Sequence, residues 1–309
     1  MLSAASILWT LLAASLAADA SYDAAVESLE AEIKAQPANR ALAEAVARRM
    51  RDPGAASPAA LRTRLQRRRI VLLRVPGLMY RSNPQTGADL ETVGEALGGG
   101  EMIVTDEVGS VESNARVVAR EAWRVASHGR RVALISASKG SADVRQALEN
   151  EPELGPRVVF WIDLVGVLEG TPLLNSRGEA TRTARRFMSS RATRSLSQNV
   201  RARAARPDRF PAQTRAVHLA AFPRAGDFSP QALAPFELLR ARGPNDGYVM
   251  LDSYLRAPGR VLIVSGADHY MRPSDPERAR SLLPRLAALV NVLLDELGPP
   301  AGDAVPLPD

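Results

Sequence analysis

The sequence predicts an α/β fold in which a mainly parallel sheet is covered by helices on both faces. Short apolar runs alternate with helical patterns from about residue 69 onward, which implies crossover connections between parallel strands. Polar residues follow several of these runs directly, at the strand ends where such sheets bind ligands. The chain has 309 residues, 46% of them hydrophobic, so it is long enough to bury one large core.

The predicted strands are continuous apolar runs bounded by turn residues, as is typical of strands buried on both faces. They cover Ile70–Val75, Met102–Thr105, Val132–Ile135, Val158–Leu164, Ala216–Phe222 and Val261–Val264. The predicted helices have apolar residues at helical spacing. They cover Ala88–Leu97, Ser113–Ser127, Ser141–Leu148 and an amphipathic closing helix, Asp275–Leu297.

The segments outside this core define the domain organisation. Residues 1–20 are mostly apolar or small and end in Ala-Asp-Ala, which is typical of an export signal. No Lys or Arg precedes the apolar run, so an uncleaved anchor is the alternative. Residues 21–66 are predicted to form a helical hairpin followed by a linker rich in Pro and Gly. The core domain is expected over 67–298, with a flexible tail at 299–309.

Composition excludes several kinds of site. Cysteine is absent and there are three histidines, so neither disulfides nor a multi-histidine metal centre is expected. The net charge is +6, and arginine clusters at Arg62–Arg69 and at Arg177–Arg209. Aromatic residues for base stacking are scarce and no nucleic-acid-binding motif occurs. We therefore interpret the clusters as a solvated basic face, which would also allow contact with an anionic membrane surface.

The most informative run is Val132–Gly140, in which an apolar strand stops at Ser138 and a helical pattern follows. A sharp strand-to-helix turn of this kind lifts a serine hydroxyl out of the sheet and leaves backbone N–H groups facing the same space. The usual pattern, small-x-Ser-x-Gly, has glycine in its first place, whereas this chain has Ser136. We predict that Ser138 is a nucleophile and that the side chain of Ser136 is crowded.

A serine nucleophile needs a base to take its proton, and a neutral imidazole is the usual choice. His269 is the best placed, because it lies in Gly-Ala-Asp-His directly after the last predicted strand. His128 stands at a helix end, where an imidazole suits the helix dipole. His218 lies within an apolar strand and is interpreted as structural. The sequence therefore predicts that His269 is the base.

A third group should orient the imidazole and stabilise its charged form. Asp246, in the turn Asn-Asp-Gly, lies between the serine and His269 in the chain. The resulting order Ser, Asp, His is the one expected of this type of sheet enzyme. Asp227 lies soon after one predicted strand and Asp163 lies at the end of another, and both stay open as alternatives to Asp246.

An acyl-transfer site also needs hydrogen-bond donors for the oxyanion that develops on the substrate. One expected donor is the backbone N–H of Lys139, directly after the serine. The other is the N–H of Leu78, in the loop Val-Pro-Gly-Leu that follows the first core strand. These groups imply neither a metal nor an organic cofactor.

Together these residues resemble the α/β-hydrolase superfamily, and within it the bacterial lipases and related esterases. The resemblance covers about residues 69–297 and rests on four places, Val75–Leu78, Ser136–Gly140, Asn245–Val249 and Gly266–His269. Two positions depart from the family pattern. Pro76 replaces the common histidine before the oxyanion glycine, and Ser136 replaces the first glycine of the nucleophile turn.

Members of this superfamily often carry a helical cap over the site, inserted after the strand that follows the nucleophile helix. Residues 175–210 occupy that position here. As a cap, this segment could turn four apolar side chains toward an acyl chain, Phe187, Met188, Leu196 and Val200. A solvated excursion without substrate contact is the alternative.

The resemblance implies a serine hydrolase that cleaves carboxylic esters through an acyl-enzyme on Ser138. An acyltransferase or thioesterase with the same three groups would differ only in the acceptor or leaving group. A hydrolase fold used for binding alone is an alternative of another class. The expected partner is a small-molecule or lipid ester, without nucleic acid, and the expected location is secreted or periplasmic.

Overall fold

The computed structural model describes residues 4–52, 57–82, 89–175, 191, 194–196, 209–271 and 276–299. Within these ranges the strands form one six-stranded sheet in the order β2-β1-β3-β4-β5-β6, and every neighbouring pair is parallel. The strands are β1 (Ile70–Val75), β2 (Glu101–Met102), β3 (Arg131–Ala137), β4 (Val158–Leu164), β5 (Arg215–Phe222) and β6 (Arg260–Ser265). The predicted fold class is therefore confirmed.

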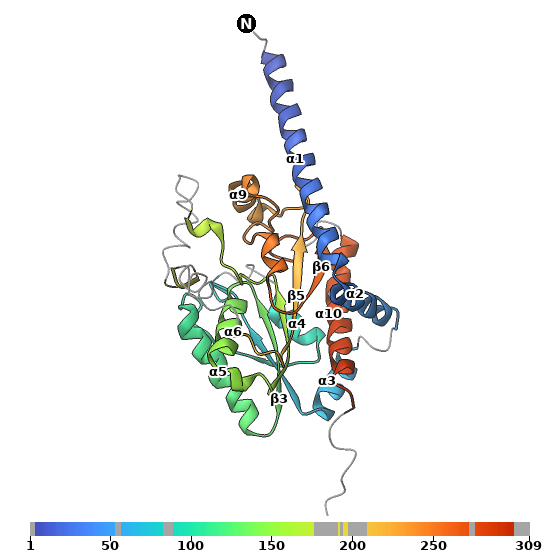
Figure 1. The fold of residues 1–309 in the computed structure, drawn as a ribbon, viewed down its shortest axis with the longest axis vertical. Helices are drawn as coiled ribbons and strands as arrows, with labels where there is room; N and C mark the ends of the chain where they lie inside the picture. The colour runs from blue at the N-terminus through green and yellow to red at the C-terminus, as the bar shows by residue number, and fades with distance from the viewer. Residues whose placement is uncertain are drawn as a thin grey trace, which may run out of the picture.

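Helices cover both faces of this sheet (Figure 1). Helices α5 and α6 pack on one face, and α2, α3, α4 and α10 contribute to the core on the other. The helices are α1 (Ala4–Ala35), α2 (Pro37–Met50), α3 (Pro58–Arg67), α4 (Leu90–Ala96), α5 (Val111–Ser127), α6 (Lys139–Asn150), α9 (Pro230–Leu239) and α10 (Pro276–Glu296).

Strand β1 shows how two cores share one sheet. Ile70 and Leu72 pack toward α3, α4 and α10, while Val71 and Leu73 pack toward α5 and α6. Successive side chains of a strand point to opposite faces, so a strand covered on both sides must be apolar throughout. This explains the continuous apolar runs of the sequence.

Helices α1 and α2 wrap around the edge strand β6. Val26 of α1 packs with Ile263 on one face of the sheet, and Leu42 of α2 joins the core on the other. Between them, the Asn39 side chain accepts a hydrogen bond of 2.8 Å from the backbone N–H of Val261. In Figure 1, α2 leaves the end of α1 in a different direction. The two predicted helices are present, and together they clasp the sheet edge.

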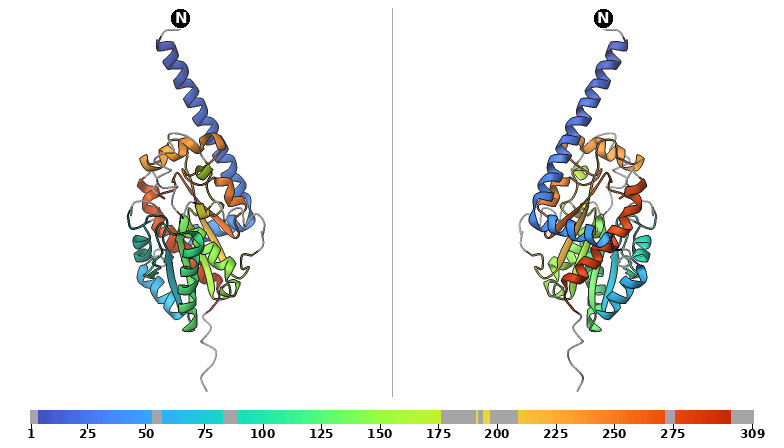
Figure 2. Two further views of the ribbon diagram at one scale, coloured as in Figure 1. Left: turned by 90° about the vertical axis from the view of Figure 1, so that its left-hand side faces the viewer. Right: turned by 90° about the vertical axis from the view of Figure 1, so that its right-hand side faces the viewer.

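The first half of α1 extends beyond the rest of the protein, whereas its second half packs against it (Figures 1 and 2). Asp19 is the first residue of α1 with a described contact to the body of the protein, an ion pair with Arg240. Among the described residues, no helix has the length and apolarity to cross a bilayer. Most of the described part of the predicted export signal, residues 4–20, therefore lies in the projecting part of α1.

Helix α3 was not predicted, because its arginines were interpreted as a solvated cluster next to a linker. Ser57 caps this helix by accepting the N–H of Ala60. Three of the arginines make tertiary contacts: Arg62 donates to the carbonyl of Gly98 at 2.7 Å, Arg64 forms an ion pair with Asp295, and Arg68 donates to the carbonyl of Gly298. These three side chains of the predicted basic face thus also tie α3 to the rest of the protein.

Most of the predicted cap, residues 175–210, and all but the first residue of the predicted tail, 299–309, lie outside the described residues. Phe187, Met188 and Val200 are among the residues that are not described. Leu196 is described and buried, and it belongs to a small cluster with Val167 and Val249.

Candidate active site

Ser138 occupies the turn between the end of β3 and the start of α6. Its backbone has φ +51° and ψ −121°, a conformation that costs a non-glycine residue about 1–3 kcal/mol and persists only where the surroundings impose it. Here the Ser138 N–H donates to the carbonyl of Leu164 at 3.0 Å, and its own carbonyl accepts the N–H of Val167 at 3.1 Å. Strand β4 and the segment after it thus hold the serine in place.

Two glycines let the loop after β1 pass against this turn. A Cβ on Gly140 would lie 2.5 Å from the carbonyl oxygens of both Val75 and Pro76, and a Cβ on Gly77 would lie 3.2 Å from the Cβ of Ser138. The first separation is shorter than real Cβ contacts allow, so a side chain at Gly140 would displace the loop. The close approach brings the segment that begins at Leu78 next to the serine.

His269 lies in the loop that follows β6 and contacts the serine. Its Nε2 is 2.9 Å from Ser138 Oγ, and its backbone N–H donates to the carbonyl of Asp246 at 2.8 Å. The preceding residue, Asp268, is fully buried and accepts the backbone N–H groups of Tyr270 and Ser229. These bonds hold the histidine loop from both sides.

Asp246 is fully buried and contacts the other side of the imidazole. Its Oδ2 is 2.9 Å from His269 Nδ1, and its Oδ1 accepts the N–H groups of Tyr248 and Val249. A carboxylate only accepts hydrogen bonds, so Nδ1 of a neutral His269 carries the proton and Nε2 is free to accept from Ser138. The structure therefore brings Ser138, His269 and Asp246 into one hydrogen-bonded chain.

The two alternative aspartates have other partners. Asp163 binds Nδ1 of His218 at 2.8 Å, and Asp227 accepts the N–H of Arg224 at 2.8 Å in the loop after β5. Since His218 Nε2 faces the carbonyl of Pro258 at 2.8 Å, both ring nitrogens face acceptors.

Ser136 is fully buried and hydrogen-bonded within this network. It accepts the indole N–H of Trp161 at 2.7 Å, and its Oγ lies 2.8 Å from that of Ser141. Ser141 in turn donates to Asp163. Ser136 thus supplies the acceptor that the buried Trp161 N–H needs, which is a physical reason for serine at this position.

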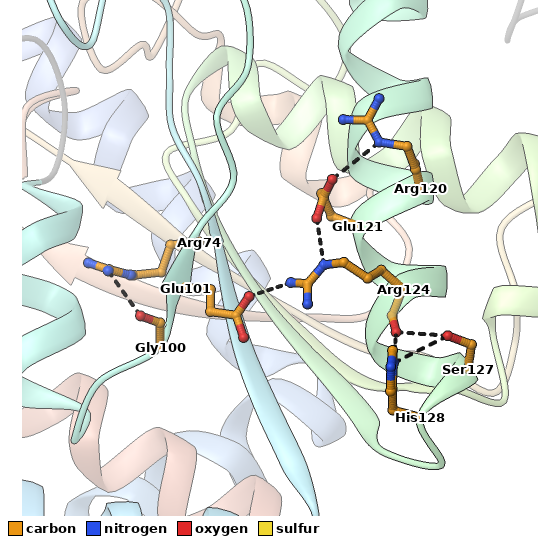
Figure 3. A network of polar contacts seen from close by, with 8 residues as sticks. All are labelled: Arg74, Gly100, Glu101, Arg120, Glu121, Arg124, Ser127 and His128. Atoms are coloured by element: carbon orange, nitrogen blue, oxygen red, sulfur yellow. Dashed lines mark hydrogen bonds and ion pairs between the residues drawn. The ribbon is translucent and has the colours of Figure 1, made fainter.

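His128 lies far from this site, at the end of α5 (Figure 3). It is exposed, and its Nδ1 donates to the carbonyl of Arg124 at 2.7 Å, so its interpretation as a capping residue is confirmed. The strand that follows, β3, runs from Arg131 to Ala137 before it reaches Ser138. Seven strand residues span roughly 23 Å, which keeps His128 out of reach of the serine.

Lys139 is the first residue of α6, so its backbone N–H belongs to the positive end of the helix dipole. Its side chain is buried and makes an ion pair with Asp143, with Nζ 2.8 Å from Oδ1. Burial raises the pKa of Asp143 to about 6, although the Lys139 ammonium opposes this shift. The Lys139 side chain therefore anchors the first turns of α6.

Sequence reasoning missed two tyrosines beside the histidine. The Tyr248 ring lies 4.8 Å from the His269 ring, and its hydroxyl is 3.0 Å from that of Tyr270. Burial raises the pKa of the Tyr248 phenol. Their positions in the sequence could have indicated them, because Tyr248 directly follows Gly247 and Tyr270 directly follows His269, both in loops of the predicted site.

The described part of the chain contains no group of three or more His, Cys, Asp or Glu residues that could hold a metal ion. The side chains at the carboxyl end of the sheet instead include one hydroxyl, one imidazole and one carboxylate in series. Such a series can move a proton from the hydroxyl to the imidazole.

No family model matches the sequence, and a comparison with curated proteins finds no match either. Solved structures similar to this one include a metagenomic carboxyl esterase, 22% identical, with 74% of this chain and 76% of that chain covered and a TM-score of 0.55. They also include the mature form of a Bacillus licheniformis lipase, 21% identical, with coverage of 71% and 91% and a TM-score of 0.57. The chain has the α/β-hydrolase fold.

Proposed function

We propose that this protein is a serine hydrolase that cleaves carboxylic esters. The observation that carries the proposal is the hydrogen-bonded chain from Ser138 Oγ to His269 Nε2 and from His269 Nδ1 to Asp246, with 2.9 Å at each step. The strained backbone of Ser138 supports it, because such strain concentrates at functional sites. The two similar structures described above are an esterase and a lipase.

In the proposed reaction, Ser138 Oγ attacks the acyl carbon of the ester while its proton passes to His269 Nε2. The tetrahedral intermediate then collapses, the bond to the alcohol oxygen breaks, and the imidazolium returns the proton to the departing alcohol. Water attacks the resulting acyl-enzyme by the same route and releases the acid. Asp246 stabilises the imidazolium in both halves of the reaction.

We further propose that the N–H groups of Lys139 and Leu78 bind the oxyanion. Lys139 N–H lies at the N-terminus of α6, where the helix dipole favours negative charge. Leu78 follows Gly77, whose backbone passes against Ser138. Donors fixed in this way by the fold need no rearrangement when charge develops on the substrate oxygen.

The test uses a fluorophosphonate probe and a series of nitrophenyl esters of increasing acyl length. We expect the purified protein to be labelled and to hydrolyse at least one ester, and Ser138→Ala to abolish labelling and to lower kcat by about 10⁴-fold or more. Ser127→Ala, which changes an exposed serine at the end of α5, is the matched control and should leave both unchanged. A folded wild type that is neither labelled nor active would contradict the proposal and favour a binding role for the fold.

We also propose that residues 1–20 direct export of the protein. The proposal is supported by the apolar sequence of this segment and by its projection from the body of the protein in Figure 1. N-terminal sequencing of the protein recovered from the periplasm or medium of a Gram-negative host tests this. A mature chain that starts near Ser21 is expected, and retention of the intact chain in the cytoplasm would contradict it.

A further inference from the structure

We propose that Tyr22 of α1 is a positioning residue for Asp246, which makes the N-terminal helical extension part of the active-site machinery. The proposal rests on the function proposed above, since it assigns Tyr22 a role in the reaction of the same site. It also gives a purpose to helix α1, which precedes the sheet and lies outside the sequence motifs of the site.

A single hydroxyl binds both backbone groups of the residue that precedes Asp246. Tyr22 Oη donates to the carbonyl of Asn245 at 2.7 Å and accepts the N–H of Asn245 at 3.1 Å. Tyr22 is 5% exposed and Asn245 is fully buried. Water therefore cannot replace the hydroxyl without a rearrangement of the helix or the loop.

The loop itself cannot satisfy these two groups. Asn245 pairs with Met250 as an isolated antiparallel bridge, but the hydrogen bonds of that bridge come from the flanking residues. Asp246 donates to Val249, and Leu251 donates to Pro244. In this antiparallel pattern the N–H and C=O of the bridging residue point away from the partner segment. At Asn245 they point to α1, where Tyr22 meets them.

The position of the Asn245 backbone determines the positions of Asp246 and His269. Asp246 is the next residue, and its carboxylate holds the imidazole of His269. The Asp246 carbonyl also accepts the backbone N–H of His269 at 2.8 Å. A shift of the Asn245 backbone would therefore move the carboxylate and the histidine loop together.

Helix α1 is a firm support for the hydroxyl. The Tyr22 ring packs edge-to-face on Phe236 at 5.0 Å, and Val26 and Ile33 of the same helix are buried against β5, β6 and the segments that follow them. Burial and the nearby Asp246 charge raise the pKa of Tyr22 far above its usual range. The hydroxyl thus keeps its proton and can donate across the whole pH range of an assay.

The test compares Tyr22→Phe with wild type in the full chain. We expect kcat for an active nitrophenyl ester to fall by about 10- to 100-fold, as a misplacement of the catalytic groups by about 1 Å would produce. KM should stay within about twofold, because the substrate contacts are unchanged. Rates are expressed per serine titrated with the fluorophosphonate, so that unfolded protein does not lower the measured kcat.

Tyr254→Phe is the matched control. Tyr254 is also a buried tyrosine near β5, and its hydroxyl has no hydrogen-bond partner in the described part of the chain. Loss of this hydroxyl removes no bond, so kcat should be unchanged. A similar loss of kcat in both variants would overturn the assignment to Tyr22.

A double-mutant cycle with Asp246→Asn separates positioning from general stability. If Tyr22 acts through Asp246, the substitution Tyr22→Phe should lower kcat little or not at all in the Asp246→Asn background. If Tyr22 had a structural role alone, Tyr22→Phe would lower kcat by the same factor in the wild-type and Asp246→Asn backgrounds. That outcome would overturn the proposal.

The failure of this inference is distinguishable from the failure of the proposed function. A wild type that is inactive and unlabelled would contradict the proposed hydrolase function itself. An active wild type together with an unchanged kcat in Tyr22→Phe would contradict only the role of Tyr22. If Tyr22→Phe yields no folded protein, Phe236→Leu loosens the ring and keeps the hydroxyl. A kcat reduced by several-fold, with KM unchanged, is then expected, and an unchanged kcat would overturn the proposal.

Discussion

The substitution Ser136→Ala tests whether the hydroxyl in the nucleophile turn serves stability or catalysis. In the structure it accepts from Trp161 at 2.7 Å and donates to Ser141, whose own proton goes to Asp163. Its removal leaves the fully buried Trp161 N–H unpaired, at a cost of about 1–3 kcal/mol, and also removes a hydrogen bond to Ser141 worth about 1 kcal/mol. The free energy of unfolding should therefore fall by about 2–4 kcal/mol.

For a chain of this size, such a loss corresponds to a Tm lower by about 3–6 °C, which circular dichroism can measure directly. We expect kcat per titrated serine to stay within about twofold, because Ser136 contacts neither His269 nor Asp246 through a described bond. Ser127→Ala, on the exposed end of α5, should shift Tm by less than about 2 °C. An unchanged Tm in Ser136→Ala, or a large loss of kcat with normal stability, would refute this reasoning.

Two further predictions concern helix α6. Burial raises the pKa of Asp143 to about 6 from a usual value of 3.8. The folded chain therefore binds the carboxyl proton more tightly than the unfolded chain does. As a result, this carboxyl lowers the free energy of unfolding as pH rises between about 4 and 6. The difference in this free energy between wild type and Asp143→Asn, from urea titrations, should fall across that window and be flat above it; a constant difference would contradict the shift. In Gly140→Ala the new Cβ would lie 2.5 Å from the Val75 and Pro76 carbonyl oxygens. The substitution should therefore displace the loop that carries Leu78 and lower kcat by about 10²-fold or more. An unchanged kcat would show that the loop accommodates the methyl group.

The fold could be predicted well from the sequence because each strand buries both faces. Runs such as Ile70–Val75 and Val158–Leu164 coincide with β1 and β4 to the residue, since turn residues and polar residues bound them sharply. Strand β2 was predicted at Met102–Thr105 but covers Glu101–Met102. The apolar run continues through Ile103, whose N–H still donates to the carbonyl of Arg74 in β1. Helix α3 was missed because its buried face consists of just Leu61 and Leu65.

The site was partly predictable, for reasons that lie in chain order and topology. Parallel strands place their carboxyl ends at one rim, so Ser138 and His269 were expected to meet there, and they do. Their catalytic roles, and that of Asp246, stay predictions. The role of Ser136 could not be derived from the sequence, because its partner Trp161 lies on a neighbouring strand and the match depends on register. The bond from Tyr22 was unpredictable for a similar reason, since it joins residues 223 positions apart.

The clasp of α1 and α2 around β6 has a consequence for self-association. An uncovered outer strand offers a row of unpaired amides and carbonyls that a second molecule could extend into a continuous ribbon. Here the Val261 amide is already taken by Asn39, and at the opposite border β2 has two residues, too few to act as a template. Both borders therefore offer few free backbone groups for pairing with a second molecule.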